Sequence, residues 1–207
     1  FKNLLAPEKV MPLALKLASR FQGIFLKDAP AESGLLARFS LPLVGDVMAN
    51  NRLLPPFART PFLDLPEVKG LGCWGANTTG LKVAFYAGGG INYLMPGVGA
   101  ASIDVLKRAG AAVMVPHGQV CCGMPAYSTG DVSSAREMAL KILEVFEAHD
   151  LDYIVTSCAT CGYGLKKLFR ELLGHTPELR NRVEAFSSKV RDITELLVHE
   201  LNFTGKG

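Results

Sequence analysis

The spacing of hydrophobic residues changes near residue 80. From Lys82 onward, short apolar runs alternate with longer segments in which apolar residues recur every three or four positions. The runs predict buried strands at residues 83–87, 112–115 and 153–156. The longer segments predict helices at residues 98–108, 133–148, 163–173, 177–189 and 190–201. Strand alternating with helix is typical of a parallel sheet covered by helices, so we expect an α/β fold.

A proline-rich segment with one amphipathic helix precedes this α/β part. Residues 4–27 predict the helix, and Leu13, Leu17, Phe21 and Ile24 share one of its faces. Six prolines between positions 30 and 66 predict short helical or irregular pieces and an extended connector docked by apolar side chains. We expect the helix to pack on the α/β part or on a partner subunit. Because the helix also carries basic residues, the alternative is that it lies on a membrane surface.

Composition excludes some classes of function. The 207 residues are 49% hydrophobic and 20% charged, enough to bury a sizeable core. Charged residues of both signs nearly balance to a net charge of +3, which gives no indication of a nucleic-acid partner. No apolar run approaches the roughly 20 residues that span a bilayer. The chain begins at Phe1 and ends without a clear stop, so we expect it to be part of a longer polypeptide.

Four of the 5 cysteines lie in two clusters. Cys121 and Cys122 are adjacent and precede Gly123, whereas Cys158 and Cys161 form a CxxC pair. A secreted disulfide scaffold is usually shorter and richer in cysteine, so we expect a reducing, cytoplasmic compartment. Soft thiolates suit iron or zinc. The alternatives are small buried residues, a vicinal disulfide, or a thioredoxin-like CxxC that leaves the adjacent pair unexplained.

Both cysteine clusters and the run Gly88-Gly89-Gly90 follow predicted strands. The carboxyl ends of parallel strands meet at one edge of a sheet, so we expect the three loops to converge. Adjacent cysteines rarely complete one tetrahedral ion, whereas neighbouring sulfurs can bind different irons of a cluster. Gly123 is expected to let the backbone pass close to a bulky cluster, and Pro125 to stiffen the exit. The helix after this loop is expected to be capped by Ser133 or Ser134, with Glu137 completing a capping box.

The stretches at 83–96, 121–125, 130–131 and 156–161 together resemble the CCG (cysteine-rich) domain family. This family includes a component of heterodisulfide reductase and the iron-sulfur components of glycolate oxidase, lactate-utilisation enzymes and anaerobic glycerol-3-phosphate dehydrogenase. Its order is a cysteine, a CC pair and a CxxC pair. The spacing matches, because 31 residues separate positions 89 and 121 and 35 separate positions 122 and 158. The resemblance implies a Rossmann-like parallel-sheet domain.

Weaker resemblances flank this domain. The proline-rich connector resembles the link to a ferredoxin portion, and residues 190–197 resemble the spacer before a second CCG domain. We therefore expect a helical, proline-rich connector segment at residues 1–80, the CCG α/β domain at 81–175 and a helical spacer at 176–207. Neither ferredoxin cysteines nor a second CCG motif is present in the sequence.

The resemblance implies an iron-sulfur electron-transfer subunit of a flavin-dependent 2-hydroxy-acid or glycerol-3-phosphate dehydrogenase. Cys121, Cys122, Cys158 and Cys161 would hold a [4Fe-4S] cluster. An FAD-containing partner subunit would oxidise the substrate. A ferredoxin-like [4Fe-4S] portion, in the same or another chain, would share the electron path to a quinone or another acceptor. The implied location is the cytoplasm or the inner face of the membrane, with no nucleic-acid partner.

Gly89 departs from the family pattern, because it stands where the family has its first cysteine. Heterodisulfide reductase relatives hold a noncubane cluster with five cysteines and act on disulfides. Here Cys73 is the only spare thiol, in a Gly-Cys-Trp-Gly turn before the first strand, and we do not expect it to reach the site. The alternatives to a [4Fe-4S] electron-transfer centre are a heterodisulfide-reductase-like subunit and a zinc-holding or vestigial assembly module.

Three further residues are candidates for the site. His117 precedes the cysteine pair by four residues and could bind or hydrogen-bond a cluster, although a solvated histidine is the more common outcome. Asn92 and Tyr93 match the family's loop and are candidates to line the site, with core packing as the alternative for Tyr93.

Overall fold

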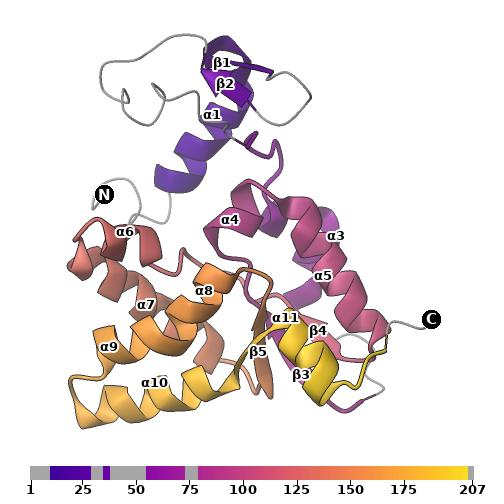
Figure 1. Ribbon diagram of the computed structural model, residues 1–207, viewed down its shortest axis with the longest axis vertical. Coiled ribbons are helices and arrows are strands. Elements are labelled where there is room, and N and C mark those ends of the chain that lie inside the picture. The colour runs from indigo at the N-terminus through magenta and orange to yellow at the C-terminus, as the bar shows by residue number, and fades with distance from the viewer. Residues whose placement is uncertain (1–9, 29–34, 38–54, 73–78, 205–207) are drawn as a thin grey trace.

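The computed structural model describes residues 10–28, 35–37, 55–72 and 79–204 (Figure 1). Its helices are α1 (Val10–Phe25), η2 (Phe62–Asp64), α3 (Pro66–Lys69), η3 (Gly70–Gly72), α4 (Gly88–Tyr93), α5 (Pro96–Arg108), α6 (Met124–Ser128), α7 (Val132–Glu147), α8 (Ala159–Tyr163), η4 (Gly164–Leu168), α9 (Phe169–Leu173), α10 (Pro177–Lys189), α11 (Ile193–Glu195) and η5 (Leu196–Glu200). Its strands are β1 (Leu26–Asp28), β2 (Leu35–Ala37), β3 (Lys82–Phe85), β4 (Ala112–Met114), β5 (Tyr153–Thr156) and β6 (Val190–Asp192).

A four-stranded parallel sheet lies at the centre of the α/β part. Its strand order is β4-β3-β5-β6, and all three pairings are parallel. Ala84 of β3 pairs with Met114 on one side and with Ile154 on the other. The expected α/β class is confirmed, and the three predicted strands correspond to β3, β4 and β5. The short strands β1 and β2 form a separate antiparallel pair.

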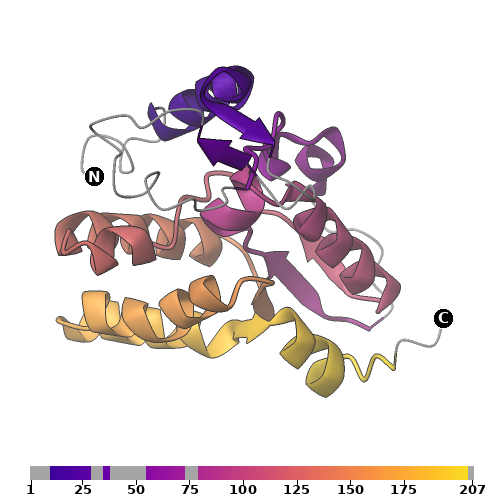
Figure 2. The ribbon, with the colours of Figure 1, turned by 45° about the horizontal axis from the view of Figure 1, so that its top comes forward.

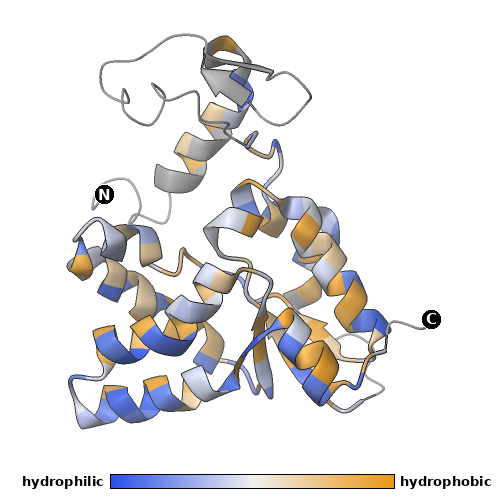
Figure 3. Cartoon of the chain, viewed as in Figure 1, coloured by the Kyte–Doolittle hydropathy of each residue, from blue (hydrophilic) through white to orange (hydrophobic). Residues whose placement is uncertain are grey.

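The sheet separates two hydrophobic cores, because successive residues of a strand point to opposite faces. Ala84 and Tyr86 belong to the core beneath α7, α9 and α10. Val83 and Phe85 belong to the core beneath α5 and η2. Figure 2 shows helices on both sides of the sheet. In Figure 3 the strands are mostly hydrophobic, whereas α10, at the outside of its layer, is largely hydrophilic.

The C-terminal part differs from the helix predicted over residues 190–201. Val190–Asp192 forms β6 at the edge of the sheet, followed by α11 and the π-helical turn η5. The Val190 side chain is fully buried, so the backbone here is extended to fill the core beside β5. Asp192 then begins the helix, and Glu195 completes a capping box with it. A strand of three residues is too short for hydrophobic periodicity to reveal.

Two other predicted helices are present with different ends. The helix expected at 133–148 is α7, and its cap is Asp131 rather than Ser133 or Ser134. The Asp131 carboxylate accepts the Ser134 backbone N–H at 3.1 Å, and a negative charge suits the positive end of a helix. The helix expected at 163–173 already begins in α8 and runs through the π-helical turn η4 into α9.

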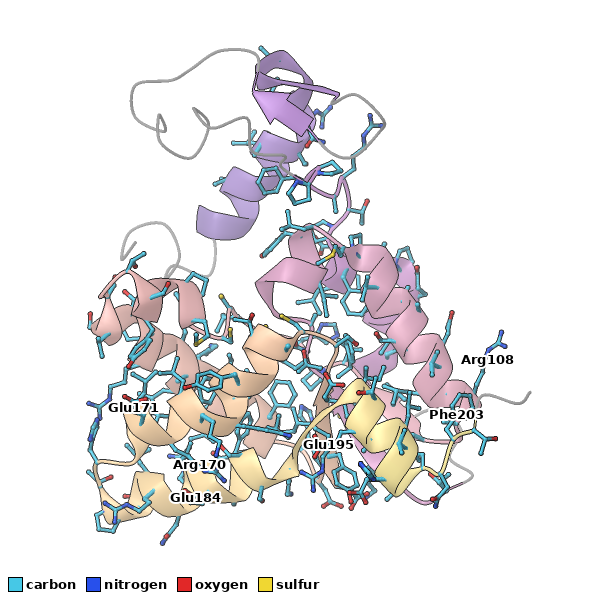
Figure 4. The ribbon with its side chains drawn as sticks, viewed as in Figure 1. Arg108, Arg170, Glu171, Glu184, Glu195 and Phe203 are labelled. Carbon is cyan, nitrogen blue, oxygen red and sulfur yellow. The ribbon has the colours of Figure 1, made fainter. Side chains whose placement is uncertain are left out.

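Helices α9 and α10 pack against each other through aromatic rings. Phe169 and Phe186 stack with their ring centroids 5.7 Å apart. At the surface, Arg170 donates to the Glu184 carboxylate at 2.9 Å, and Figure 4 labels both side chains. Both partners of this ion pair are partly exposed, so the aromatic contact contributes more to the packing.

The connector at residues 55–62 joins the N-terminal helix to the α/β part. The Gln22 side chain donates to the Phe57 carbonyl at 3.2 Å and accepts the Phe57 N–H at 3.0 Å. Phe62 is fully buried and meets Phe85 edge-on, with ring centroids 5.7 Å apart. Docking of the connector by apolar side chains is therefore confirmed for its described residues.

The apolar face of α1 is exposed. Leu13, Leu17, Phe21 and Ile24 are each between 48% and 60% exposed, so the described α/β part does not cover them. A partner subunit or a membrane surface stays a prediction for this face, and residues 4–9 of the expected helix lie outside the described residues. Within the described ranges, no helix has the length and apolar character needed to cross a bilayer.

Candidate functional site

The carboxyl ends of β3, β4 and β5 bring the glycine run and both cysteine clusters together. Strand β3 lies between β4 and β5, so the loop after it is flanked by the two cysteine-bearing loops. A cavity of about 380 Å³ opens here, a size typical of small-molecule and cofactor sites. Its lining residues are Ala14, Phe57, Gly89, Gly90, Tyr93, Leu94, Cys121, Cys122, Met124, Pro125, Cys158, Thr160 and Cys161. The predicted convergence of the three loops is confirmed.

All four clustered cysteines line this cavity as free thiols. Cys122 and Cys161 are only 3% and 5% exposed, whereas Cys121 and Cys158 are half-buried. The Cys122 thiol lies close enough to the thiols of Cys121 and Cys161 for both to affect its pKa. The CC pair and the CxxC pair are therefore in direct contact within a mainly apolar wall.

As free thiols, the adjacent cysteines are weak acids. The hydrogen bond with Cys122, followed by burial, raises the pKa of Cys121 well above its ordinary value. The hydrogen bond with Cys121 lowers the pKa of Cys122, but the bond with Cys161 and burial outweigh it and raise that pKa to about 12. The backbone N–H groups of Gly123 and Met124 act in the opposite direction by bonding to the sulfurs of Cys121 and Cys122. These N–H groups favour the thiolate form that a metal requires.

The glycine run leaves room beside the sulfur atoms. A β-carbon on Gly88 would lie 2.7 Å from Sγ of Cys161, and Gly88 has φ of +62°. A β-carbon on Gly89 would lie 3.9 Å from Sγ of Cys121, and no other nearby segment comes within 4 Å. Position 89, where the resemblance places a cysteine, therefore faces the same cavity as the four thiols.

Gly123 allows a close approach to α7. Its φ is +80°, and a β-carbon there would meet the Ala135 carbonyl oxygen of α7 at 3.0 Å. The glycine thus lets the loop pass close to the α7 backbone, and its expected role beside a cluster stays a prediction. Pro125 lies in the first turn of α6, where its missing N–H costs no hydrogen bond. The turn and the close approach to α7 fix where Cys122 enters the core.

The CxxC pair spans the beginning of α8. Cys158 is the N-cap residue, and Cys161 follows within the helix. The buried Thr156, at the end of β5, accepts the Cys158 N–H on its hydroxyl at 3.3 Å. Residues three apart lie on the same side of a helical turn, so both sulfurs reach the cavity.

Of the other predicted candidates, the structure places some at the cavity and others away from it. Tyr93 lines the cavity. Asn92 is buried, and its side-chain oxygen accepts the Leu63 N–H at 2.9 Å, which is a packing role. His117 is exposed and does not line the cavity. Cys73 lies outside the described residues.

Several residues of the site were not predicted from the sequence. Ala14 and Phe57 belong to the N-terminal segment and line the same cavity as the cysteines. Tyr86 is fully buried, and burial and then the nearby cysteines raise its pKa well above its ordinary value. Gln119 bonds to the end of β3. No motif marks these residues, and the position of Gln119 two residues before the cysteine pair is the only indication in the sequence.

The number and arrangement of the thiols indicate which metal group they could hold. Among the described residues, no three His, Cys, Asp or Glu side chains lie close enough together to hold one metal ion. All four thiols line the cavity of about 380 Å³. Cysteine thiolates are the usual ligands of iron-sulfur clusters, whose irons take sulfur from several directions. A donor set of four thiols at one cavity therefore fits an iron-sulfur cluster.

Comparison with known protein families matches residues 83–166 to a family model described as CCG, cysteine-rich domain. Residues 83–166 of the chain are thus similar to CCG domains. The matched segment includes all three loops at the carboxyl edge of the sheet and both cysteine clusters. The family resemblance of the motifs is confirmed, whereas the domain limits at residues 80 and 175 stay predictions.

Curated relatives of this chain include two kinds of protein. It is 34% identical over 130 residues to lactate utilization protein A 1 of Bacillus cereus, covering 61% of this chain and 52% of the relative. The values are the same for lactate utilization protein A of Bacillus cytotoxicus. An uncharacterized iron-sulfur protein of Methanocaldococcus jannaschii is 36% identical over 122 residues, which cover 59% of this chain and 22% of that protein. The chain thus spans about half the length of the lactate utilization proteins it matches.

Proposed function

We propose that Cys121, Cys122, Cys158 and Cys161 hold a [4Fe-4S] cluster and that the chain belongs to an electron-transfer subunit. The observation that carries the proposal is the meeting of four free thiols from two loops at one apolar cavity. Two relatives support it by name, one as an iron-sulfur protein and one as a lactate utilization protein. The cluster, when bound, supplies one-electron redox chemistry.

The chain's own residues adapt the site to this task. The apolar wall formed by Phe57, Leu94 and Met124 limits access of water to the sulfurs. The N–H groups of Gly123 and Met124 favour the thiolate forms of Cys121 and Cys122. Backbone N–H groups near the sulfurs and low solvent access both tune the reduction potential of a cluster.

Four thiolates favour electron transfer over disulfide chemistry. With one thiolate for each iron of a [4Fe-4S] cluster, no iron is left open to bind a substrate sulfur. Gly89 contributes no fifth thiol, although its position faces Cys121. The heterodisulfide-reductase-like alternative needs such an open iron, so it is the weaker hypothesis.

The partners follow from the same proposal. We infer that an FAD-containing subunit oxidises a 2-hydroxy acid such as lactate, in line with the names of the relatives, or glycerol 3-phosphate. Electrons then pass through a ferredoxin-like [4Fe-4S] portion and this CCG domain to a quinone or another acceptor. We place the assembly in the cytoplasm, with any membrane contact being peripheral.

Anaerobic purification with analysis of iron, acid-labile sulfide and zinc tests the proposal. We expect about four irons and four sulfides for this domain, and an EPR signal on reduction that does not change on adding disulfides. Serine variants of Cys121, Cys122, Cys158 and Cys161 should each lose this signal. The matched control is Cys73→Ser, which should keep it. Stoichiometric zinc without iron would overturn the proposal, and a signal that appears only when thiol is added after oxidation would favour a disulfide reductase.

A further inference from the structure

The loop that carries Cys121 and Cys122 has little backbone support. Between the end of β4 and Gly123, the described residues 116–122 contain one tight turn, at residues 117–118, and no other backbone–backbone hydrogen bond is found for them within the described structure. Two glycines with positive φ, Gly118 and Gly123, add turns to the same loop. Since backbone bonds do not fix the loop, its position depends on side-chain contacts.

The Gln119 side chain provides most of these contacts. Its Nε2 group donates to the Phe85 carbonyl at 2.9 Å and to the Pro116 carbonyl at 3.0 Å. Its Oε1 atom accepts the Ala87 N–H at 3.1 Å. Phe85 and Ala87 flank the turn from β3 into the glycine run, so one amide joins the glycine loop to the cysteine loop. Both N–H donors of the amide and its oxygen are used.

Tyr86 provides a second link between the same two loops. Its hydroxyl donates to the Val120 carbonyl at 2.8 Å, immediately before Cys121. The ring is fully buried, so this bond forms away from competing water. Gln119 and Tyr86 therefore hold residues 119 and 120 of the cysteine loop against the end of β3.

We propose that Gln119 is a positioning residue that fixes the cysteine pair against the glycine loop. Its hydrogen bonds to Phe85 and Ala87 set the separation between Cys121 and position 89, where a β-carbon would lie 3.9 Å from the cysteine sulfur, and its bond to Pro116 shapes the cysteine loop itself. Without them the loop has only the Tyr86 bond and the packing of its side chains on the core. For cluster readouts the inference rests on the proposed function, but the geometry of the thiols is testable without iron.

The first experiment measures alkylation of each cysteine in the iron-free, full-length protein by iodoacetamide and mass spectrometry. Gln119→Leu removes all three bonds at similar size. Gln119→Glu keeps only the acceptor for Ala87 and puts a carboxylate against two carbonyl oxygens. We expect Cys121 and Cys122 to react about tenfold faster in Gln119→Leu, because loop opening becomes easier. The rates at Cys158 and Cys161 should stay unchanged.

The matched control is Lys189→Met. Lys189 also bonds to a backbone carbonyl, that of Leu151 at 2.7 Å, but at the amino end of β5. This variant should leave all four alkylation rates unchanged. Unchanged rates at Cys121 and Cys122 in both Gln119 variants would overturn the proposal, as would equal acceleration at all four thiols. If Gln119→Leu does not fold, Gln119→Glu gives the answer, with an expected severalfold acceleration at the same two cysteines.

The second experiment uses the iron-loaded protein. We expect the Gln119 variants to shift the EPR g values and the reduction potential of the cluster, while Lys189→Met keeps those of the wild type. A purely structural glutamine would lower iron content without moving either property. Should the wild type bind no iron, the proposed function fails, and the alkylation rates alone still decide whether Gln119 positions the pair.

Discussion

Gly89 faces Cys121 across the cavity: a β-carbon at position 89 would stand 3.9 Å from the cysteine sulfur. The distance is ordinary van der Waals contact, so a β-carbon at this position fits without displacing its neighbours. Although glycine stands where the family has its first cysteine, the surrounding geometry is able to take one.

Gly89→Cys should give a fifth thiol at the site. We expect the variant to keep the stability of the wild type, because the β-carbon of its new side chain meets no clash, and to bind iron with a changed EPR spectrum. Thiol titration of the iron-free protein, thermal unfolding and EPR of the reduced protein measure these properties. Gly90→Cys is the matched control, since Gly90 also lines the cavity but a β-carbon there approaches no atom within 4 Å. A spectrum that changes equally in both variants would contradict the special position of residue 89.

Gly88→Ala should damage both the fold and the site. The positive φ of Gly88 and the 2.7 Å approach to Cys161 leave no room for a methyl group, and we expect a loss of about 1–2 kcal/mol in the free energy of unfolding. Cys161 must move, so iron content should fall as well. Urea unfolding and iron analysis check both effects. Gly90→Ala, in the same short helix, should be neutral or slightly stabilising, and equal losses in the two variants would refute the argument.

The sequence predicted the site better than its surroundings. The order of strands and the rule that parallel strands share a carboxyl edge were enough to bring Cys121, Cys122, Cys158 and Cys161 together. The cysteine spacing added the family. Ala14 and Phe57 were missed because their contact with the cavity depends on tertiary docking of a distant segment, which leaves no local pattern.

The errors in the fold have local physical causes. The cap of α7 was assigned to a serine because hydroxyl and carboxylate caps look alike in sequence, and the structure selects Asp131. The sequence did not indicate that Gly123 would lie against the backbone of α7 at Ala135. In both cases the residue type was informative, but its partner depended on packing that periodicity does not encode.

Val190→Ala should test the strand that the sequence missed. Val190 is fully buried at the point where β6 pairs with Ile154 of β5. Removing two methyl groups from such a position is expected to cost about 2 kcal/mol in the free energy of unfolding, from lost burial and the cavity left behind. Val198→Ala is the control, because Val198 is 58% exposed in the following turn. Equal effects of the two changes in urea unfolding would argue against a buried edge strand.

Asp131→Asn should reveal how the cap of α7 depends on pH. The backbone N–H of Ser134, followed by its hydroxyl, holds the pKa of Asp131 below its ordinary value. A folded-state pKa below the unfolded value of about 3.9 means that the charge stabilises the fold above that pH. This contribution is lost as the pH falls through the folded-state pKa. Asparagine keeps an acceptor for the helix end but never carries the charge.

Urea unfolding of the wild type and Asp131→Asn at a series of pH values measures this effect. We expect the wild type to be the more stable protein near pH 7, with the difference shrinking below about pH 4 and vanishing once the carboxyl is protonated in both states. The loss should appear in the unfolding of α7, whose Ala135 supports the turn at Gly123. A difference that stays constant over the whole pH range would show that the carboxylate charge does not stabilise this helix and that only its acceptor oxygen matters.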